Sequence, residues 1–221
     1  MKLIYKDVGH IISFDNGYVN ELVIENKYIF FNMVNHATIQ SDGGKGDFLL
    51  SVSDKPVEFN RYADVTVQFA PFQINRKSLL TKLYAALEQN ALRAENYKET
   101  GELLNEMERY VLQLSEDLPF EVDCQRLSIG SIIKAVSPEI DEVDKTHLEK
   151  VFAYMELVRE LDRDRLFIMI NMRTYFSNDE METFIESVCL HGFKVLLIES
   201  TSQKRLKNTK RYTIDEDLCE F

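Results

Sequence analysis

The fold is decided by residues 165–200, which read RLFIMINMRTYFSNDEMETFIESVCLHGFKVLLIES. Leu166–Ile170 is an uninterrupted apolar run of strand composition, and Phe193–Ile198 is a second run that is apolar except for Lys194. Between them, Ser177 and Glu180 have the S-x-x-E spacing of a capping box, in which the hydroxyl accepts from the glutamate amide and the carboxylate reaches back. An apolar helix face follows at three- and four-residue spacing, made of Met181, Phe184, Ile185, Val188 and Cys189. This order predicts a right-handed crossover between parallel strands, in a central sheet that is covered on both faces.

Length and composition predict a folded, soluble protein. The chain has 221 residues, of which 45% are hydrophobic and 29% charged, enough for one large domain or two small ones. We expect no membrane span, because no apolar run approaches the roughly 20 residues that a span needs. We expect no secretory signal either, because residues 1–5 are followed by no long apolar stretch. Cys124, Cys189 and Cys219 form no C-x-x-C pair, which is typical of reduced thiols and predicts a cytoplasmic protein.

The hydrophobic pattern divides the chain into a head and an arm. We predict an α/β fold with a mostly parallel sheet in a head formed by residues 1–71 and 146–221, and an α-helical arm over residues 72–145 inserted into it. Within the head, residues 27–36 have the pattern of a short helix, although their aromatic content leaves a strand open. Residues 146–163 have the pattern of a long amphipathic helix.

The arm consists of helices with leucine-rich faces. One helix is expected from Arg76 to about residue 92, with Asn75 as its cap, and another over residues 97–114. Pro119 is expected to terminate this pair of helices. A short helix is expected over residues 129–136. The pattern is that of a helical hairpin or a projecting arm.

A glycine cluster over residues 41–47 could suggest a nucleotide-binding loop. Such a loop follows a strand and opens a helix with Lys-Ser/Thr. Here the cluster precedes an apolar run at 48–52, and Lys45 is followed by Gly46. We therefore interpret the cluster as the turn of a β-hairpin.

An acidic group beside Pro119 is the candidate metal site. It comprises Glu116, Asp117, Glu121 and Asp123, and carboxylates on a bent segment suit a hard cation such as calcium. The spacing lacks the D-x-[DN]-x-[DN]-G loop. From the residues alone, a solvated acidic turn remains the alternative.

The densest cationic run lies between the central strands and a last short strand over residues 212–214. It comprises Lys204, Arg205, Lys207, Lys210 and Arg211, with no acidic residue among residues 201–211. These side chains could contact phosphate oxygens, and Arg126 and Lys134 are two further candidates in the arm. The net charge of −11 argues against a large open basic surface but not against a local one. A solvated loop is the alternative.

Several stretches in matching order resemble one known family. They are Phe72–Asn75 with Leu79–Leu83 and Leu87–Glu88, Phe120–Asp123, Leu166–Phe176, Asp179–Glu180, Val195–Glu199, and Tyr212–Asp217. The family is the CRISPR-associated ring protein of type II-A systems, the small fourth protein needed for acquiring new spacers.

The resemblance implies a head of nucleotide-hydrolase-like ancestry that has lost its phosphate loop and has no established enzyme activity. It also implies a homotetramer, a ring that encloses double-stranded DNA, threads onto DNA ends and needs calcium. Glu121 and Asp123 match the family's acidic turn and become the first choice as calcium ligands, with Glu116 and Asp117 as weaker candidates. The expected protein partners are the CRISPR adaptation integrase complex and the RNA-guided effector nuclease. A DNA-binding role for residues 204–211 is our own inference from their charge.

Two other classes of function remain open from the sequence. One is an enzyme, either a metal-dependent nuclease built on the acidic group or a nucleotide hydrolase, although the missing Gly-Lys-Ser/Thr loop argues against hydrolysis. The other is a protein-only scaffold of the adaptation complex.

Overall fold

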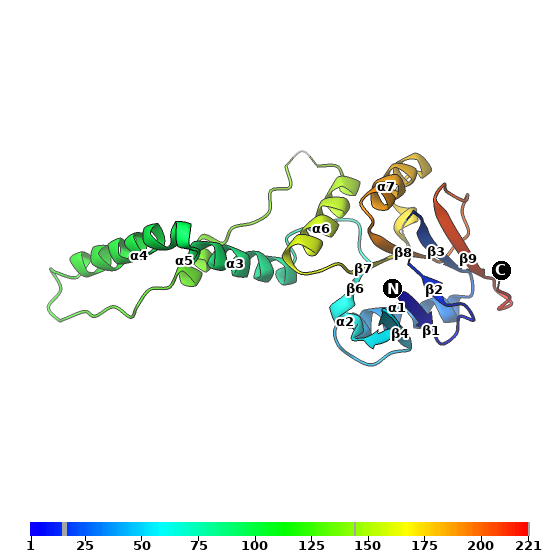
Figure 1. Cartoon of the computed structure of the whole chain (residues 1–221), viewed down its shortest axis with the longest axis horizontal. Coiled ribbons are helices and arrows are strands. Elements are labelled where there is room, and N and C mark those ends of the chain that lie inside the picture. Colours follow the sequence, from blue (N-terminus) through cyan, green and yellow to red (C-terminus); the bar gives the residue numbers. More distant parts are fainter. Residues whose placement is uncertain (15–16, 144, 221) are drawn as a thin grey trace. The chain divides into compact units, whose positions relative to one another are not determined.

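The chain divides into two compact units. The computed structural model describes residues 1–14, 17–143 and 145–220. One unit combines Met1–Gln73 with Asp144–Phe221 and is named the sheet unit; the other is Ile74–Val143 and is named the helical unit. Figure 1 labels the elements of both. The division into a head domain over residues 1–71 and 146–221 and an arm domain over residues 72–145 stays a prediction.

A five-stranded parallel sheet forms the centre of the sheet unit, with strand order β6-β7-β8-β3-β9. Its strands are β3 (Val19–Ile24), β6 (Ala63–Thr66), β7 (Leu166–Ile170), β8 (Lys194–Glu199) and β9 (Thr209–Ile214). Helix α7 (Asn178–Leu190) connects β7 to β8, which pair in parallel with Ile168 opposite Leu196. Every residue of β3 and β7 is buried. The predicted α/β class, the crossover and the covered central sheet are confirmed.

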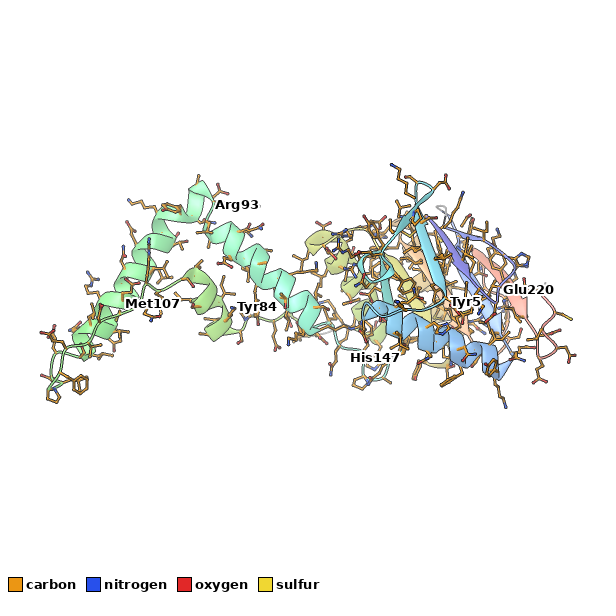
Figure 2. The ribbon with its side chains drawn as sticks, turned by 90° about the horizontal axis from the view of Figure 1, so that it is seen from below. Tyr5, Tyr84, Arg93, Met107, His147 and Glu220 are labelled. Atoms are coloured by element: carbon orange, nitrogen blue, oxygen red, sulfur yellow. The ribbon has the colours of Figure 1, made fainter. Side chains whose placement is uncertain are left out.

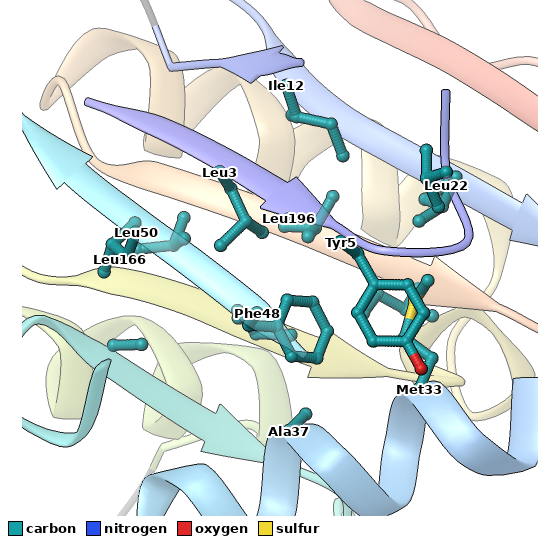
Figure 3. Packing of buried hydrophobic residues seen from close by; sticks show 14 of the residues in the cluster. Leu3, Tyr5, Ile12, Leu22, Met33, Ala37, Phe48, Leu50, Leu166 and Leu196 are labelled. Carbon is teal, nitrogen blue, oxygen red and sulfur yellow. The ribbon is translucent and has the colours of Figure 1, made fainter. Parts of the chain in front are cut away.

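A second, antiparallel sheet packs with helix α1 (Lys27–Ser41) on one face of the parallel sheet. Its order is β2-β1-β4-β5, from β1 (Lys2–Tyr5), β2 (Ile12–Ser13), β4 (Phe48–Val52) and β5 (Lys55–Val57); a one-turn helix, α2 (Phe59–Tyr62), precedes β6. Figure 3 shows Tyr5 and Phe48 beside Met33 of α1, in the same buried cluster as Leu22 and Leu196. The helix predicted over residues 27–36 is confirmed and is longer than expected.

The other face of the parallel sheet is covered by α7 and α6 (His147–Leu161). Leu22 lies in the core cluster on the α1 side, so its neighbours along β3 point to the α7 side. Both helices begin with a full capping box, Ser177 with Glu180 in α7 and Thr146 with Glu149 in α6. The capping box predicted for α7 is confirmed.

The helical unit contains α3 (Lys77–Ala91), α4 (Ala94–Leu114) and α5 (Ile129–Val136), and α5 has the predicted bounds. Figure 2 labels Arg93 at the corner between α3 and α4. One detail of the prediction is wrong. Asn75 does not cap α3, because its side chain forms hydrogen bonds with the amide and the carbonyl of Ile140, at 2.8 and 3.0 Å. Helix α4 ends at Leu114, as predicted, and begins at Ala94, three residues before the expected start.

The glycine cluster over residues 41–47 is not a hairpin turn, so that prediction is also wrong. The segment joins the end of α1 to the start of β4, because the helix continues beyond the predicted end at residue 36. Gly43 ends it with a φ of +86°, the left-handed conformation that glycine adopts without strain. Among the described residues, no helix combines the length and apolarity needed to cross a membrane.

Candidate nucleic-acid interface

The predicted cationic run forms a loop and the start of a strand. Residues 201–208, named the basic loop, connect β8 to β9. The strand predicted over residues 212–214 is present but begins earlier, because β9 starts at Thr209. Thr209 pairs in parallel with Val19 of β3, which fixes where the loop ends.

The basic loop has its own apolar anchor. Leu206 is buried, whereas the side chains of Lys204, Arg205 and Lys207 are exposed around it. The Thr209 hydroxyl donates to the Leu206 carbonyl at 2.7 Å. These contacts turn the cations outward.

Beneath the basic loop, the carboxylate of Glu21 on β3 accepts hydrogen bonds from two arginines. Its side chain is 0% exposed, and its Oε1 and Oε2 accept from Arg173 at 2.5 Å and Arg211 at 2.7 Å. Arg173 lies in the short 3-10 helix η1 (Met172–Thr174) after β7, and Arg211 is directly opposite Glu21 in the β3–β9 register. A buried carboxylate is costly unless it is paired and hydrogen-bonded, and both of its oxygens are satisfied here.

The same two arginines also bond the backbone of the basic loop. Arg173 Nη2 donates to the Lys204 carbonyl at 2.6 Å. Arg211 Nη1 donates to the Gln203 carbonyl at 2.8 Å. The main chain of the loop is therefore hydrogen-bonded to arginines of the sheet unit. The lysine side chains of the loop take no part in these hydrogen bonds.

Glu199, the last residue of β8, is a second buried acid beside this pair. Burial raises the pKa of Glu199 to about 7, and the Glu21 carboxylate adds to the rise, whereas the amides of Arg173 and Met172 and the Arg173 charge oppose it. Its Oε1 accepts from the Arg173 amide at 3.1 Å. Sequence reasoning missed Glu21, Arg173 and Glu199. For the two glutamates, the available signal was an acid within or at the end of a buried strand.

The other predicted DNA-contacting residues have varied surroundings. Lys207 forms a surface ion pair with Glu182 at 3.4 Å, a contact of little energetic value. The Lys210 ammonium lies 5.2 Å from the centre of the Tyr212 ring. Arg126 and Lys134 are exposed in the helical unit. Their roles in DNA binding stay predictions, as does that of Arg211.

The predicted calcium ligands do not converge in one protomer. Glu116 and Asp117 follow α4, and Glu121 and Asp123 lie in the segment before α5 that has no regular structure. All four are exposed. Within residues 1–14, 17–143 and 145–220, no group of three or more His, Cys, Asp or Glu side chains is placed to hold a metal ion. Carboxylates suit calcium, but calcium takes about six to eight oxygen ligands, so one protomer alone does not provide a fitting site.

In the described part of the chain, the carboxyl ends of the parallel strands, where α/β folds usually bind phosphate, lack a phosphate-binding loop between β3 and α1. Ligands in such folds bind at the carboxyl ends of the strands, and β3 leads to α1 through Glu25 and Asn26 alone. The Asn26 side chain accepts from the amides of Tyr28 and Ile29, which occupies the N-terminus of α1. A cavity of about 540 Å³ at this edge includes Glu25 and Glu216 with Lys27. Two carboxylates against one ammonium do not suit a phosphate group.

Comparisons with known proteins agree on one family. A family model described as CRISPR-associated protein (Cas_Csn2) matches residues 40–218. The chain is similar to "CRISPR-associated protein Csn2" of Enterococcus faecalis, with 26% identity over 167 residues that cover 74% of this chain and 72% of the relative. The protein of the same description from Streptococcus agalactiae is 23% identical over 203 residues, covering 89% of this chain and 87% of the relative. The crystal structure of Stu0660 of Streptococcus thermophilus matches with a TM-score of 0.53 and 12% identity, covering 90% of this chain and 68% of that one, which shows a shared fold.

Proposed function

This chain belongs to the Csn2 family of CRISPR-associated proteins, which take part in spacer acquisition, and from that membership we propose that it binds double-stranded DNA ends without reading sequence, as a homotetrameric ring stabilised by calcium. Type II-A adaptation is the setting of this role.

The basic loop is the observation that carries the DNA-binding part of the proposal. The chain has a net charge of −11, yet residues 201–211 contain five cations and no acid. Lys204, Arg205 and Lys207 are exposed on a backbone that is already held in place. A backbone that is already held in place loses little conformational freedom on binding, and each phosphate that the cations neutralise releases counterions from DNA.

Binding of this kind does not depend on base sequence. Contacts from lysine and arginine to phosphate oxygens fix position on the duplex and carry no sequence information directly. We therefore expect similar affinities for duplexes of different sequence and a steep fall of affinity with salt.

The assembly part of the proposal is supported by helix α4. Leu103, Met107, Tyr110, Val111 and Leu114, named the α4 stripe, share one helix face and are between 40% and 63% exposed. No residue of α4 is buried. An apolar helix face is ordinarily covered by another element, and a second copy of the chain is the cover we propose. Closed symmetry of four copies would repeat the basic loop around one channel.

Calcium enters the proposal through family membership. Because Glu116, Asp117, Glu121 and Asp123 do not converge in one protomer, a calcium site there would need oxygen ligands from a second copy or a rearranged segment. Glu121 and Asp123 remain the first-choice ligands. Unchanged assembly and DNA binding after treatment with a calcium chelator would remove calcium from the proposal.

We propose a binding role and not an enzymatic one. The direct β3–α1 connection through Glu25 and Asn26 leaves no room for a phosphate-cradling loop. ATP turnover, or magnesium-dependent nicking that stops in Glu121→Gln, would favour the enzyme instead. The adaptation integrase and the RNA-guided effector nuclease are the protein partners we expect, and a protein-only scaffold is the conclusion if no DNA binds at low salt with calcium.

The decisive experiment compares two triple-alanine variants. One removes Lys204, Arg205 and Lys207; the control removes three exposed cations elsewhere in the sheet unit, Lys6, Lys55 and Arg61. Affinity for a short blunt duplex is measured over a salt series by fluorescence anisotropy. The loop variant is expected to bind more weakly, with a log–log salt slope shallower by about 0.9 for each phosphate that is no longer neutralised. Equal weakening in the two variants would contradict a specific role of the loop.

A further inference from the structure

We propose that Arg173 and Arg211 are positioning residues, which clamp the basic loop to the sheet and thereby set where its cations stand. The proposed role of both is to hold the loop, and it requires no contact of their own with DNA. The clamp itself stands on contacts within the sheet unit, and its consequence for DNA rests on the proposed function.

Arg173 connects three parts of the sheet unit with one guanidinium. Its Nη1 donates to Glu21 on β3, and its Nη2 donates to Asn178 at the start of α7 at 3.1 Å and to the Lys204 carbonyl at 2.6 Å. The Arg173 side chain is only 1% exposed. A side chain so buried cannot reach a phosphate, so its cationic donors bond the protein's own groups, two of them side chains and one a backbone carbonyl.

Arg211 completes the clamp from the next strand. Its Nε donates to Glu21 at 2.7 Å and its Nη1 to the Gln203 carbonyl at 2.8 Å. The planar arginine fork offers five N–H donors in fixed directions. Lysine keeps the charge but has one compact ammonium group, which cannot satisfy the carboxylate and the distant carbonyl together.

The basic loop needs such a clamp because of its own charge. Lys204, Arg205 and Lys207 stand within four residues, and like charges at this density repel and favour open conformations. The two arginines bond main-chain carbonyls at Gln203 and Lys204, and Leu206 is buried beyond them. The cationic side chains are thus kept facing solvent while the backbone that carries them is fixed.

The test uses Arg173→Lys and Arg211→Lys, which leave the charge of the protein unchanged. Arg165→Lys is the matched control. Arg165 is 17% exposed against 14% for Arg211; it likewise pairs with an acid, Asp162, and donates to two carbonyls, those of Asn60 and Ala63. The control therefore removes the same kind of fork at a different place in the sheet unit.

The first readout needs no DNA. Trypsin cleavage after Lys204, Arg205 and Lys207 is followed by mass spectrometry, because cleavage requires the loop to open locally. Removal of one charged hydrogen bond is expected to speed this cleavage by about tenfold or more, and Arg165→Lys is expected to leave it unchanged. Unchanged cleavage in both Arg173→Lys and Arg211→Lys overturns the clamp. If Arg173→Lys does not fold, Arg211→Lys at its partly exposed site decides the same question.

The second readout is affinity for the blunt duplex, measured in a double-mutant cycle with Lys204→Ala, Arg205→Ala and Lys207→Ala. Arg211→Lys is expected to weaken binding several-fold, and the alanine triple is expected to cost less in that background than in the native chain. Faster cleavage with neither variant affecting DNA affinity supports the clamp and overturns the proposed function of the loop. Additive effects on affinity overturn the link between the clamp and DNA binding.

Discussion

The sheet unit and the helical unit differ in how far their apolar side chains are buried. In the sheet unit, every residue of β3 and β7 is buried between α1 with the antiparallel sheet on one side and α7 on the other. In the helical unit, α4 has no buried residue over its 21 positions. The difference teaches that the central strands of the first unit are covered by their own chain, whereas the second presents an apolar helix face for which we propose a second copy as the cover.

The two units differ in their charged groups as well. The sheet unit buries Glu21 and Arg173 as a hydrogen-bonded pair, and this pair holds the basic loop. In the helical unit, the four acidic residues considered as calcium ligands all lie exposed. Buried charge therefore fixes geometry in one unit, and exposed charge remains available for ions or partners in the other.

The largest effect is expected from adding charge to the α4 stripe. Met107→Glu with Val111→Glu should reduce the sedimenting species to a monomer, because two carboxylates would have to be buried between copies. Asn105→Glu with Gln113→Glu adds the same charge outside the stripe and should leave assembly intact. Sedimentation velocity measures both, and equal behaviour of the two variants would show that the stripe is not an interface.

A leucine truncation in each unit sharpens the comparison of burial. Leu197 on β8 is 0% exposed and Leu114 on α4 is 63% exposed. Leu197→Ala should lower the free energy of unfolding by about 2–5 kcal/mol, because apolar packing is removed and a cavity remains. Leu114→Ala should change it by less than about 0.5 kcal/mol in a dissociated protomer. Urea unfolding followed by circular dichroism provides both values, and a similar cost at the two sites would contradict the contrast.

The buried acid Glu199 should make the stability of the sheet unit depend on pH. Its pKa is raised from 4.5 to about 7 by burial, so the folded state keeps a proton that the unfolded chain releases. The stability that this proton contributes is fully present below pH 4.5 and is lost as pH rises through about 7.

Glu199→Gln removes this dependence. Between pH 5 and pH 8, the native chain should lose roughly 2–3 kcal/mol more unfolding free energy than the variant. Urea unfolding at the two pH values tests the difference. A variant that loses as much as the native chain would show that Glu199 is ionised in the folded protein.

The smallest effect concerns the helix caps. Ser177 caps α7 with a full capping box, whereas the side chain of Arg93, the N-cap residue of α4, makes no capping hydrogen bond. Ser177→Ala should cost about 1 kcal/mol of unfolding free energy. Arg93→Ser should instead stabilise the helical unit by up to a similar amount. Thermal unfolding distinguishes the two signs, and a destabilising Arg93→Ser would mean that the arginine has a role beyond capping.

Local signals in the sequence predicted the elements of the fold well. The Ser177–Glu180 spacing identified a real capping box, and the apolar runs around it gave the β7–α7–β8 crossover. Each of these features depends on residues a few positions apart. The hairpin predicted at residues 41–47 failed because the end of α1 was placed too early, at residue 36.

The candidate site depended on neighbours that are distant in the sequence, and was therefore only partly predictable. The cations of the basic loop were visible as a charged run. The pairing of Glu21 with Arg211 follows from the parallel register of β3 with β9, which no local pattern reveals. Asn75 was mistaken for a cap for the same reason, since its partner, Ile140, lies 65 residues away.

The central claim is that a strongly acidic chain binds duplex DNA by assembling into a closed ring. Sedimentation velocity with calcium, on labelled blunt linear duplex and on covalently closed circular duplex, tests it most directly. The account predicts a species larger than the protomer that moves with the linear duplex and not with the circular one, and that dissociates from DNA as salt rises. A monomer that binds both DNA forms equally, or neither, would contradict it.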